Sequence, residues 1–199
     1  MVHMVQKRDT RANKNKGDAK DNLELEIMLG LLKGENHLRG IAKLLDASHS
    51  TVSRTLARFI DENVLDFKTE GKNKVFFIKK NLQAKNYVFN AERYKLIQLL
   101  KQYPELGIII EDVLKNCDAK MIILFGSFAK GTAKKDSDID IYIETTDRKI
   151  KDKIETLHSK ISVKIGDFDT HDQLIKEIIK NHIIVKGADD FYDRLGFFE

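Results

Sequence analysis

The chain has 199 residues, of which 42% are hydrophobic and 33% are charged, with 11 glycines and 1 proline. This composition is typical of a globular protein and excludes a collagen-like or largely disordered chain. No run of about 18 apolar residues is present to span a membrane, and the N-terminus lacks the apolar core of a secretory signal. The single cysteine, Cys117, excludes a disulfide framework. We therefore expect a cytoplasmic protein without a membrane partner.

The positive charge is concentrated in the first part of the sequence. Residues 1–83 carry 16 Lys/Arg and 11 Asp/Glu, whereas residues 84–199 carry 19 and 20. This asymmetry predicts a polyanionic partner for the first part, and a basic tail that only aids solubility is the alternative. Residues 1–21 lack apolar periodicity and are predicted to form a flexible basic arm. The arm would add salt-dependent affinity for nucleic acid through Lys7, Arg8, Arg11, Lys14 and Lys16.

The first half of the sequence predicts three helices followed by a β-hairpin. Apolar residues recur with helical spacing in three segments, 22–32, 37–45 and 48–60. Ser48 or Ser50 is the candidate N-cap of the third helix. Two apolar runs, 64–67 and 75–78, flank a turn sequence that contains Gly71, which favours a hairpin.

The second half predicts helices and strands in alternation. A long helix is expected from about Lys85 to Gln102, and Pro104 begins another helix that continues to Leu114. Apolar runs and alternation predict strands at 121–125, 138–144 and 161–165. Helical spacing predicts further helices at 149–159, 173–181 and 189–195. The expected fold class is therefore α+β, with a small mixed sheet flanked by helices in the C-terminal part.

The order of elements in residues 22–83 resembles a winged helix-turn-helix domain. In that family the third helix enters the major groove of DNA, so the resemblance implies double-stranded DNA as a partner. The candidate DNA-binding residues are Ser50, Thr51, Ser53, Arg54 and Arg58 on the third helix and Lys72 and Lys74 at the hairpin tip. A protein–protein module, in which the serines serve as capping and turn residues, is the alternative.

The most informative segment is LFGSFAKGTAKKDSDIDIYI, residues 124–143. A buried strand ends at Gly126-Ser127, where free amides at a helix start and the Ser127 hydroxyl form a cradle for phosphate. Gly126 lets the backbone approach an anion closely, and Gly131 allows the chain to turn away.

Two aspartates follow this loop on the next predicted strand. Asp138 and Asp140 are two residues apart, so they point to the same face of a strand. Neighbouring carboxylates repel and are costly to desolvate, and a divalent cation removes that cost. Oxygen ligands favour Mg²⁺ or Mn²⁺. A phosphate cradle beside a metal-binding pair predicts phosphoryl or nucleotidyl transfer.

The segment also resembles a known family. Gly126-Ser127, Gly131 and Ser137-Asp138-Ile139-Asp140-Ile141 match the signature of the DNA polymerase beta-like nucleotidyltransferase superfamily. The compact region 104–199 is similar to its minimal nucleotidyltransferase branch. The resemblance implies that Gly126 and Ser127 bind the triphosphate, and that Asp138 and Asp140 are catalytic residues that bind the metal. Lys130 lies close in sequence and is a further candidate nucleotide-binding residue.

One part of the family pattern is missing. The family usually places a third acidic residue on the next core strand, but the central polar positions of 161–165 are Ser162 and Lys164. Asp167 or Asp169 is a weak candidate for the third catalytic carboxylate if the strand is longer or shifted, and Glu144 ranks below Asp167.

The sequence therefore predicts four segments: a basic arm (1–21), a winged helix-turn-helix domain (22–83), a helical linker (84–103) and a nucleotidyltransferase domain (104–199). The predicted reaction transfers a nucleoside monophosphate from an NTP to an acceptor hydroxyl. The alternative is a DNA-binding regulator whose second domain senses nucleotide without turnover, because the third carboxylate is missing. A homodimer through the 84–103 helix and a protein acceptor are further possibilities.

Overall fold

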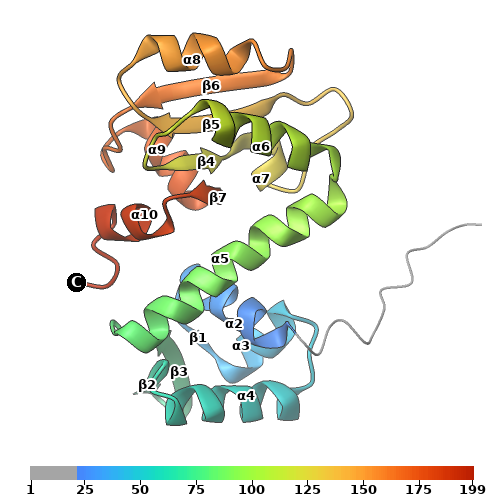
Figure 1. Ribbon diagram of the computed structural model, residues 1–199. Helices are drawn as coiled ribbons and strands as arrows, with labels where there is room; N and C mark the ends of the chain where they lie inside the picture. The colour runs from blue at the N-terminus through green and yellow to red at the C-terminus, as the bar shows by residue number, and fades with distance from the viewer. Residues whose placement is uncertain (1–21) are drawn as a thin grey trace, which may run out of the picture.

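A computed structural model describes residues 22–199, so the predicted arm 1–21 lies outside the described residues. The fold is α+β, with a three-stranded sheet in the N-terminal part and a four-stranded sheet in the C-terminal part. A long helix runs between them (Figure 1). Within the described residues, no helix is both long and apolar enough to cross a membrane.

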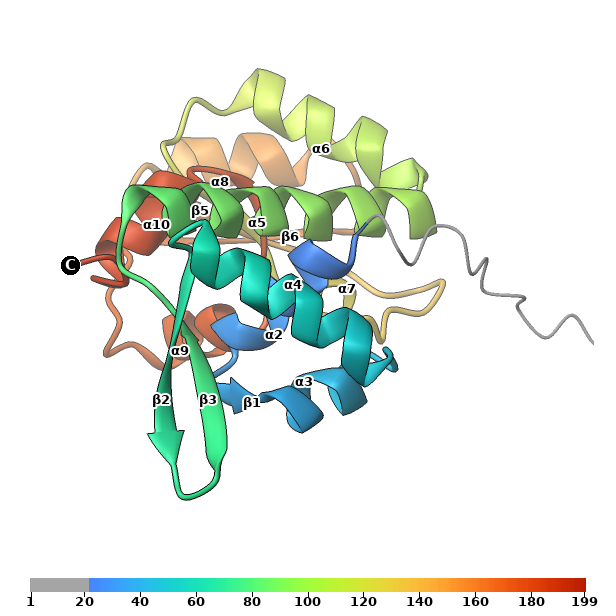
Figure 2. The same ribbon diagram turned by 90° about the horizontal axis from the view of Figure 1, so that it is seen from below.

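The N-terminal part is a winged helix-turn-helix, as predicted. Its elements are α2 (Leu23–Leu32), β1 (Asn36–His37), α3 (Leu38–Leu44), α4 (His49–Asp61), β2 (Leu65–Glu70) and β3 (Asn73–Ile78). The strands are antiparallel in the order β1-β3-β2. The two-residue strand β1 was not predicted, because so short a strand leaves no pattern of its own. Viewed from below, the hairpin β2–β3 projects beside α3 and α4 (Figure 2).

Residues close in sequence account for the start of α4 and for the turn of the hairpin β2–β3. The Ser48 hydroxyl caps α4 by accepting a hydrogen bond from the Thr51 amide at 3.2 Å, which decides between the two candidate caps. Buried Val52, Leu56 and Phe59 fix the inner face of α4. In the hairpin, Glu70 pairs with Asn73, so Gly71 and Lys72 form a two-residue turn.

The helix α5 (Leu82–Gln102) joins the two parts. The side chain of Asn81 caps it by accepting from the Ala84 amide at 2.9 Å. Ala84, Val88 and Ala91 are fully buried in a core that also contains residues of both sheets. The core is therefore continuous between the two parts, and the division of the chain into domains stays a prediction.

The C-terminal part is a small mixed sheet flanked by helices. Its elements are α6 (Glu105–Asn116), β4 (Ile122–Leu124), α7 (Gly126–Ala129), β5 (Ile139–Glu144), α8 (Arg148–Glu155), β6 (Ile161–Gly166), α9 (Gln173–Lys180), β7 (Ile183–Lys186) and α10 (Ala188–Arg194). The strand order is β6-β5-β4-β7, with β5 and β6 parallel and the other pairs antiparallel. The sequence did not predict β7, whose four residues lie directly between two helices.

Side chains along β5 point alternately to the two faces of this sheet. Ile139, Ile141 and Ile143 are buried in a core with α6 and α8. Asp140 and Tyr142 point to the other face, where Tyr142 packs in a core with α9, α10 and α5. The first residues of β5 thus bring the acidic side chain of Asp140 to the edge of a largely apolar sheet.

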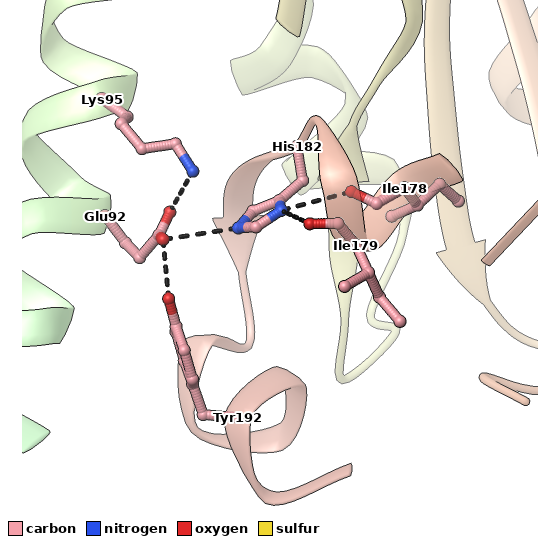
Figure 3. A network of polar contacts seen from close by, with 6 residues as sticks. All are labelled: Glu92, Lys95, Ile178, Ile179, His182 and Tyr192. Atoms are coloured by element: carbon pink, nitrogen blue, oxygen red, sulfur yellow. Dashed lines mark hydrogen bonds and ion pairs between the residues drawn. The ribbon is translucent and has the colours of Figure 1, made fainter. Parts of the chain in front are cut away.

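A buried polar network fastens α5 to the end of the chain (Figure 3). Glu92 of α5 is 2% exposed, and its Oε1 lies 2.8 Å from the Tyr192 hydroxyl and 3.4 Å from His182 Nε2. Lys95 Nζ lies 2.8 Å from Oε2. Burial alone would raise the pKa of Glu92, but His182 and Lys95 outweigh it and the pKa falls to about 2. The ionised carboxylate therefore connects α5 with β7 and α10.

Candidate functional site

The candidate phosphate loop follows β4 directly. Gly126 adopts a φ of +69°, in the left-handed region that favours glycine, and the chain then forms the single turn of α7. The Phe125 amide donates to the Asp140 carbonyl at 3.0 Å, and the Thr132 amide donates to the Ser127 carbonyl at 2.9 Å. The first bond joins the start of the loop to β5, and the second closes the loop on itself, with Ser127 partly buried.

Gly126 is in close contact with the Asp140 side chain. A Cβ at position 126 would lie 2.9 Å from Asp140 Cγ and 3.1 Å from Asp140 Cβ, which is closer than real side chains approach. Glycine is therefore required here both by backbone conformation and by space. The structure brings the predicted phosphate loop and one predicted metal ligand into a single site.

The two aspartates lie at the entrance of β5. Asp138 is exposed and Asp140 is partly buried. Burial raises the pKa of Asp140, and repulsion from Asp138 adds to the rise, whereas Lys164 and Lys130 oppose it. Within residues 22–199, no hydrogen bond or ion pair reaches either carboxylate group. The two lysines therefore act on the pair only through space, without a direct ion pair.

This donor set fits a hard divalent cation. No group of three or more His, Cys, Asp or Glu side chains gathers as a metal site among the described residues. Mg²⁺, however, is commonly held by one or two carboxylates together with substrate phosphates. Asp138 and Asp140 supply two carboxylates, and the loop at Gly126 lies in contact with Asp140 to place phosphates.

The structure places Lys130 beside this site but pairs it with an acid that the sequence did not indicate. Lys130 Nζ lies 2.5 Å from Glu177 Oε1 of α9, and this hydrogen bond lowers the pKa of Glu177. Glu177 also acts on Asp140 through its charge. The two residues are 47 apart in sequence, so only the packing of α9 against the site reveals the pair.

The structure does not bring Asp167 or Glu144 to the aspartate pair. Asp140 is in register with Ser162, and Asp167 follows the end of β6 five residues further on, about 16 Å along the strand. Glu144, at the far end of β5, is bound by Arg194 Nη2 at 2.7 Å. On β6, the positions on the Asp140 face are Ser162 and Lys164.

A second candidate surface lies on the winged helix. A groove of about 620 Å³ runs between α4 and the hairpin, with an apolar floor that includes Leu56 and Phe76. Among residues 22–199, no Asp or Glu lines it, and its polar residues include His37, Arg39, His49, Ser53, Lys72 and Lys74. The structure thus gathers three of the predicted DNA-binding residues. His37, Arg39 and His49 were missed, because their proximity to the wing depends on tertiary packing.

Three other predicted DNA-binding residues, Ser50, Thr51 and Arg58, are engaged within the protein. The hydroxyls of Ser50 and Thr51 lie 3.1 and 2.7 Å from Ser48 Oγ, in the cap of α4. Arg58 is ion-paired with Glu24 and lies 3.6 Å from Glu62, on the α2 side of the helix.

Arg54 makes a single contact inside the protein, among the residues that the structure describes. Its Nε lies 3.4 Å from the Ser50 carbonyl oxygen, and no acid pairs with its guanidinium. Arg54 is exposed on α4. Its guanidinium is therefore available to an external anion.

Two solved structures are similar to parts of the chain. One is the homodimeric winged helix-turn-helix DNA-binding domain (fragment 1–100) of a possible ArsR-family transcriptional regulator from Mycobacterium bovis, at 24% identity over 43% of this chain and 74% of that chain, with a TM-score of 0.30. The other is a crystal structure of a toxin-antitoxin with AMP-PNP, at 21% identity over 52% and 81%, with a TM-score of 0.32. At these scores neither similarity supports a conclusion about this chain.

A search of curated proteins finds no match. A family model does match the C-terminal part: residues 108–191 match the family described as Polymerase beta, Nucleotidyltransferase. The matched segment contains the loop at Gly126, both aspartates and strand β6. The match supports the nucleotidyltransferase superfamily, predicted from residues 126–141, for this part of the chain.

Proposed function

We propose that the protein is a Mg²⁺-dependent nucleotidyltransferase that transfers a nucleoside monophosphate from an NTP. The observation that carries the proposal is the contact between Gly126 and Asp140, beside Asp138, within the segment matched by the nucleotidyltransferase family. A phosphate loop and an unpartnered carboxylate pair in one site favour a triphosphate bound together with a cation.

Each residue has a role in this proposal. Asp138 and Asp140 hold the cation, which when bound neutralises charge on the triphosphate and on the leaving pyrophosphate. Ser127 and the amides that follow Gly126 bind phosphate oxygens. Lys130 exchanges Glu177 for phosphate when the nucleotide binds, because a triphosphate carries more negative charge than one carboxylate.

A transfer assay with α-³²P-labelled NTP tests the proposal. We expect the wild type to incorporate label in the presence of Mg²⁺ and the double variant Asp138→Ala, Asp140→Ala to lose incorporation. Lys115→Ala, which changes the charge of an exposed residue of α6, is the control and should retain activity. Equal incorporation by the wild type and the double variant would reject the site.

A nucleotide-sensing regulator is the second candidate function, and the lack of a carboxylate on the Asp140 face of β6 favours it. It predicts NTP binding without turnover, and a DNA affinity that changes with nucleotide. The buried network at Glu92 gives a physical connection between α5 and the C-terminal sheet for such coupling. Product analysis during prolonged incubation with NTP separates the two candidates, since only the transferase releases pyrophosphate.

We also propose that the winged helix binds double-stranded DNA. The support is the groove at the wing, which contains Arg39, Lys72 and Lys74 and, in the part of the chain that the structure describes, no acidic lining residue. Fluorescence anisotropy with duplex DNA at several salt concentrations tests it. A nucleic-acid complex predicts that the logarithm of affinity falls linearly with the logarithm of salt concentration, and affinity independent of salt would contradict it.

A further inference from the structure

Strand β6 lies on one side of the aspartate pair and the phosphate loop lies on the other. In the sheet order β6-β5-β4-β7, Gly126 and Ser127 follow β4, whereas β6 flanks β5 on the opposite side (Figure 1). In phosphoryl transfer the attacking and leaving oxygens are roughly in line. If the triphosphate lies against Gly126 and Ser127, the acceptor approaches over β6.

The side chains on this acceptor side are a serine and a lysine. Ser162 is in register with Asp140, and Lys164 with Tyr142, so both lie on the Asp140 face of the sheet. Ser162 is partly buried and Lys164 is exposed. In the part of the chain that the structure describes, Lys164 forms no ion pair or hydrogen bond through its side chain. An unpaired cation therefore stands where the acceptor approaches.

This arrangement suits one class of acceptor better than another. A hydroxyl is a weak nucleophile until a base removes its proton, and the Asp140 face of β6 carries no carboxylate to do so. A phosphate monoester is already ionised at neutral pH, and lysine and serine are common phosphate ligands. Building on the proposed transferase function, we propose that the acceptor is a phosphate monoester bound by Lys164 and Ser162.

The corresponding reaction needs no proton transfer from the acceptor. An anionic oxygen of the phosphate monoester forms a bond to the α-phosphorus of the NTP. The bond between that phosphorus and the oxygen bridging to the β-phosphate breaks, and the electron pair leaves with pyrophosphate. The product is a phosphoanhydride that joins the nucleoside monophosphate to the acceptor phosphate.

Binding of phenyl phosphate tests the acceptor site without turnover. Calorimetric titration into the full chain with Mg²⁺ and α,β-methylene ATP should show binding that weakens about tenfold in Lys164→Ala and is largely kept in Lys164→Arg. Lys115→Ala, on the opposite face of the sheet, should bind like the wild type. Equal affinity in wild type and Lys164→Ala, or no phenyl phosphate binding by a wild type that binds nucleotide, would overturn the acceptor proposal. Failure to bind nucleotide would reject the proposed function itself.

A matched pair of acceptors tests the chemistry. With α-³²P-labelled ATP, the wild type should label phenyl phosphate and leave phenol unlabelled. Lys164→Glu places a carboxylate where a base is otherwise missing, so it should lose transfer to phenyl phosphate and gain transfer to phenol. Labelling of phenol but not phenyl phosphate by the wild type would overturn the proposal.

Discussion

The two candidate surfaces of the molecule differ in whether their charged side chains form ion pairs within the protein. On the winged helix, Arg58 is neutralised by Glu24 and Glu62 from the same part of the chain. At the entrance of β5, neither Asp138 nor Asp140 has a partner within residues 22–199, and burial raises the pKa of Asp140. The difference is that Arg58 is ion-paired with acids of its own part of the chain, whereas the carboxylates of Asp138 and Asp140 form no ion pair among the described residues.

Of the variants compared here, Gly126→Ala should cause the largest loss, which is a loss of nucleotide binding at the β5 site. It adds left-handed strain and a clash with Asp140, together about 3 kcal/mol or more, so Mg²⁺-dependent nucleotide binding should fall at least about hundredfold. Gly131→Ala is a matched control, because its φ is +68° but nothing lies within 4 Å of the added Cβ. Calorimetry measures both variants. Similar losses in the two would show that strain, and not contact with Asp140, limits the site.

Glu92→Gln tests a third charged group, which is buried and ion-paired with Lys95. The folded pKa of about 2 lies below the ordinary value of 4.5, so the ionised group contributes about 3 kcal/mol at pH 7. That contribution is present above pH 4.5 and is lost as pH falls toward 2, with about 1.4 kcal/mol gone at pH 3.5. Urea unfolding at pH 7 and pH 3.5 should show the difference between wild type and variant shrinking accordingly.

An exposed glutamate provides the control for this experiment. Glu111, on α6, is 71% exposed and lies 3.7 Å from Lys115. Glu111→Gln should change the free energy of unfolding by less than about 1 kcal/mol at either pH. A difference between wild type and Glu92→Gln that stayed constant from pH 7 to pH 3.5 would mean that the Glu92 charge does not stabilise the fold.

Arg54→Ala and Arg58→Ala compare a free and an internally paired arginine on one helix. Arg54→Ala should weaken duplex DNA binding by about 1 kcal/mol, and Arg58→Ala by clearly less, because Arg58 is bound to Glu24 and Glu62. Anisotropy titrations at fixed salt measure both variants. A larger loss in Arg58→Ala would show that its ion pairs open on DNA binding.

The smallest expected effect is a gain in affinity for nucleotide. Glu177→Gln releases Lys130 from its exposed ion pair, so the affinity for Mg²⁺–ATP should rise by about two- to threefold. Glu111→Gln makes the same change of charge on another helix and should leave the affinity unchanged. An affinity that falls in Glu177→Gln would identify Glu177 as a contributor to nucleotide binding instead of a competitor for Lys130.

The sequence predicted the local features of the molecule well. The cap of α4, the hairpin at Gly71 and the strand that carries Asp140 directly after Asp138 each depend on residues close in sequence. The sequence predicted a phosphate loop beside the two aspartates, and the structure adds the close packing of Gly126 against the Asp140 side chain.

The features that the sequence did not reveal depend on contacts between distant segments. Glu177 reaches Lys130 through the packing of α9, and Glu92 meets His182 across 90 residues. Strand β7 is defined by pairing with β4, since its short apolar run has no pattern that separates it from the flanking helices. The position of Asp167 required the register of β5 with β6, which periodicity alone does not fix.

The most direct test of the account is the Mg²⁺ dependence of nucleotide binding at the aspartate pair. Calorimetry with α,β-methylene ATP should show binding to the wild type that strengthens at least about tenfold when Mg²⁺ is added. In the variant Asp138→Asn, Asp140→Asn the affinity should be the same with and without Mg²⁺. Equal strengthening by Mg²⁺ in both proteins would contradict the claim that these two carboxylates hold the cation.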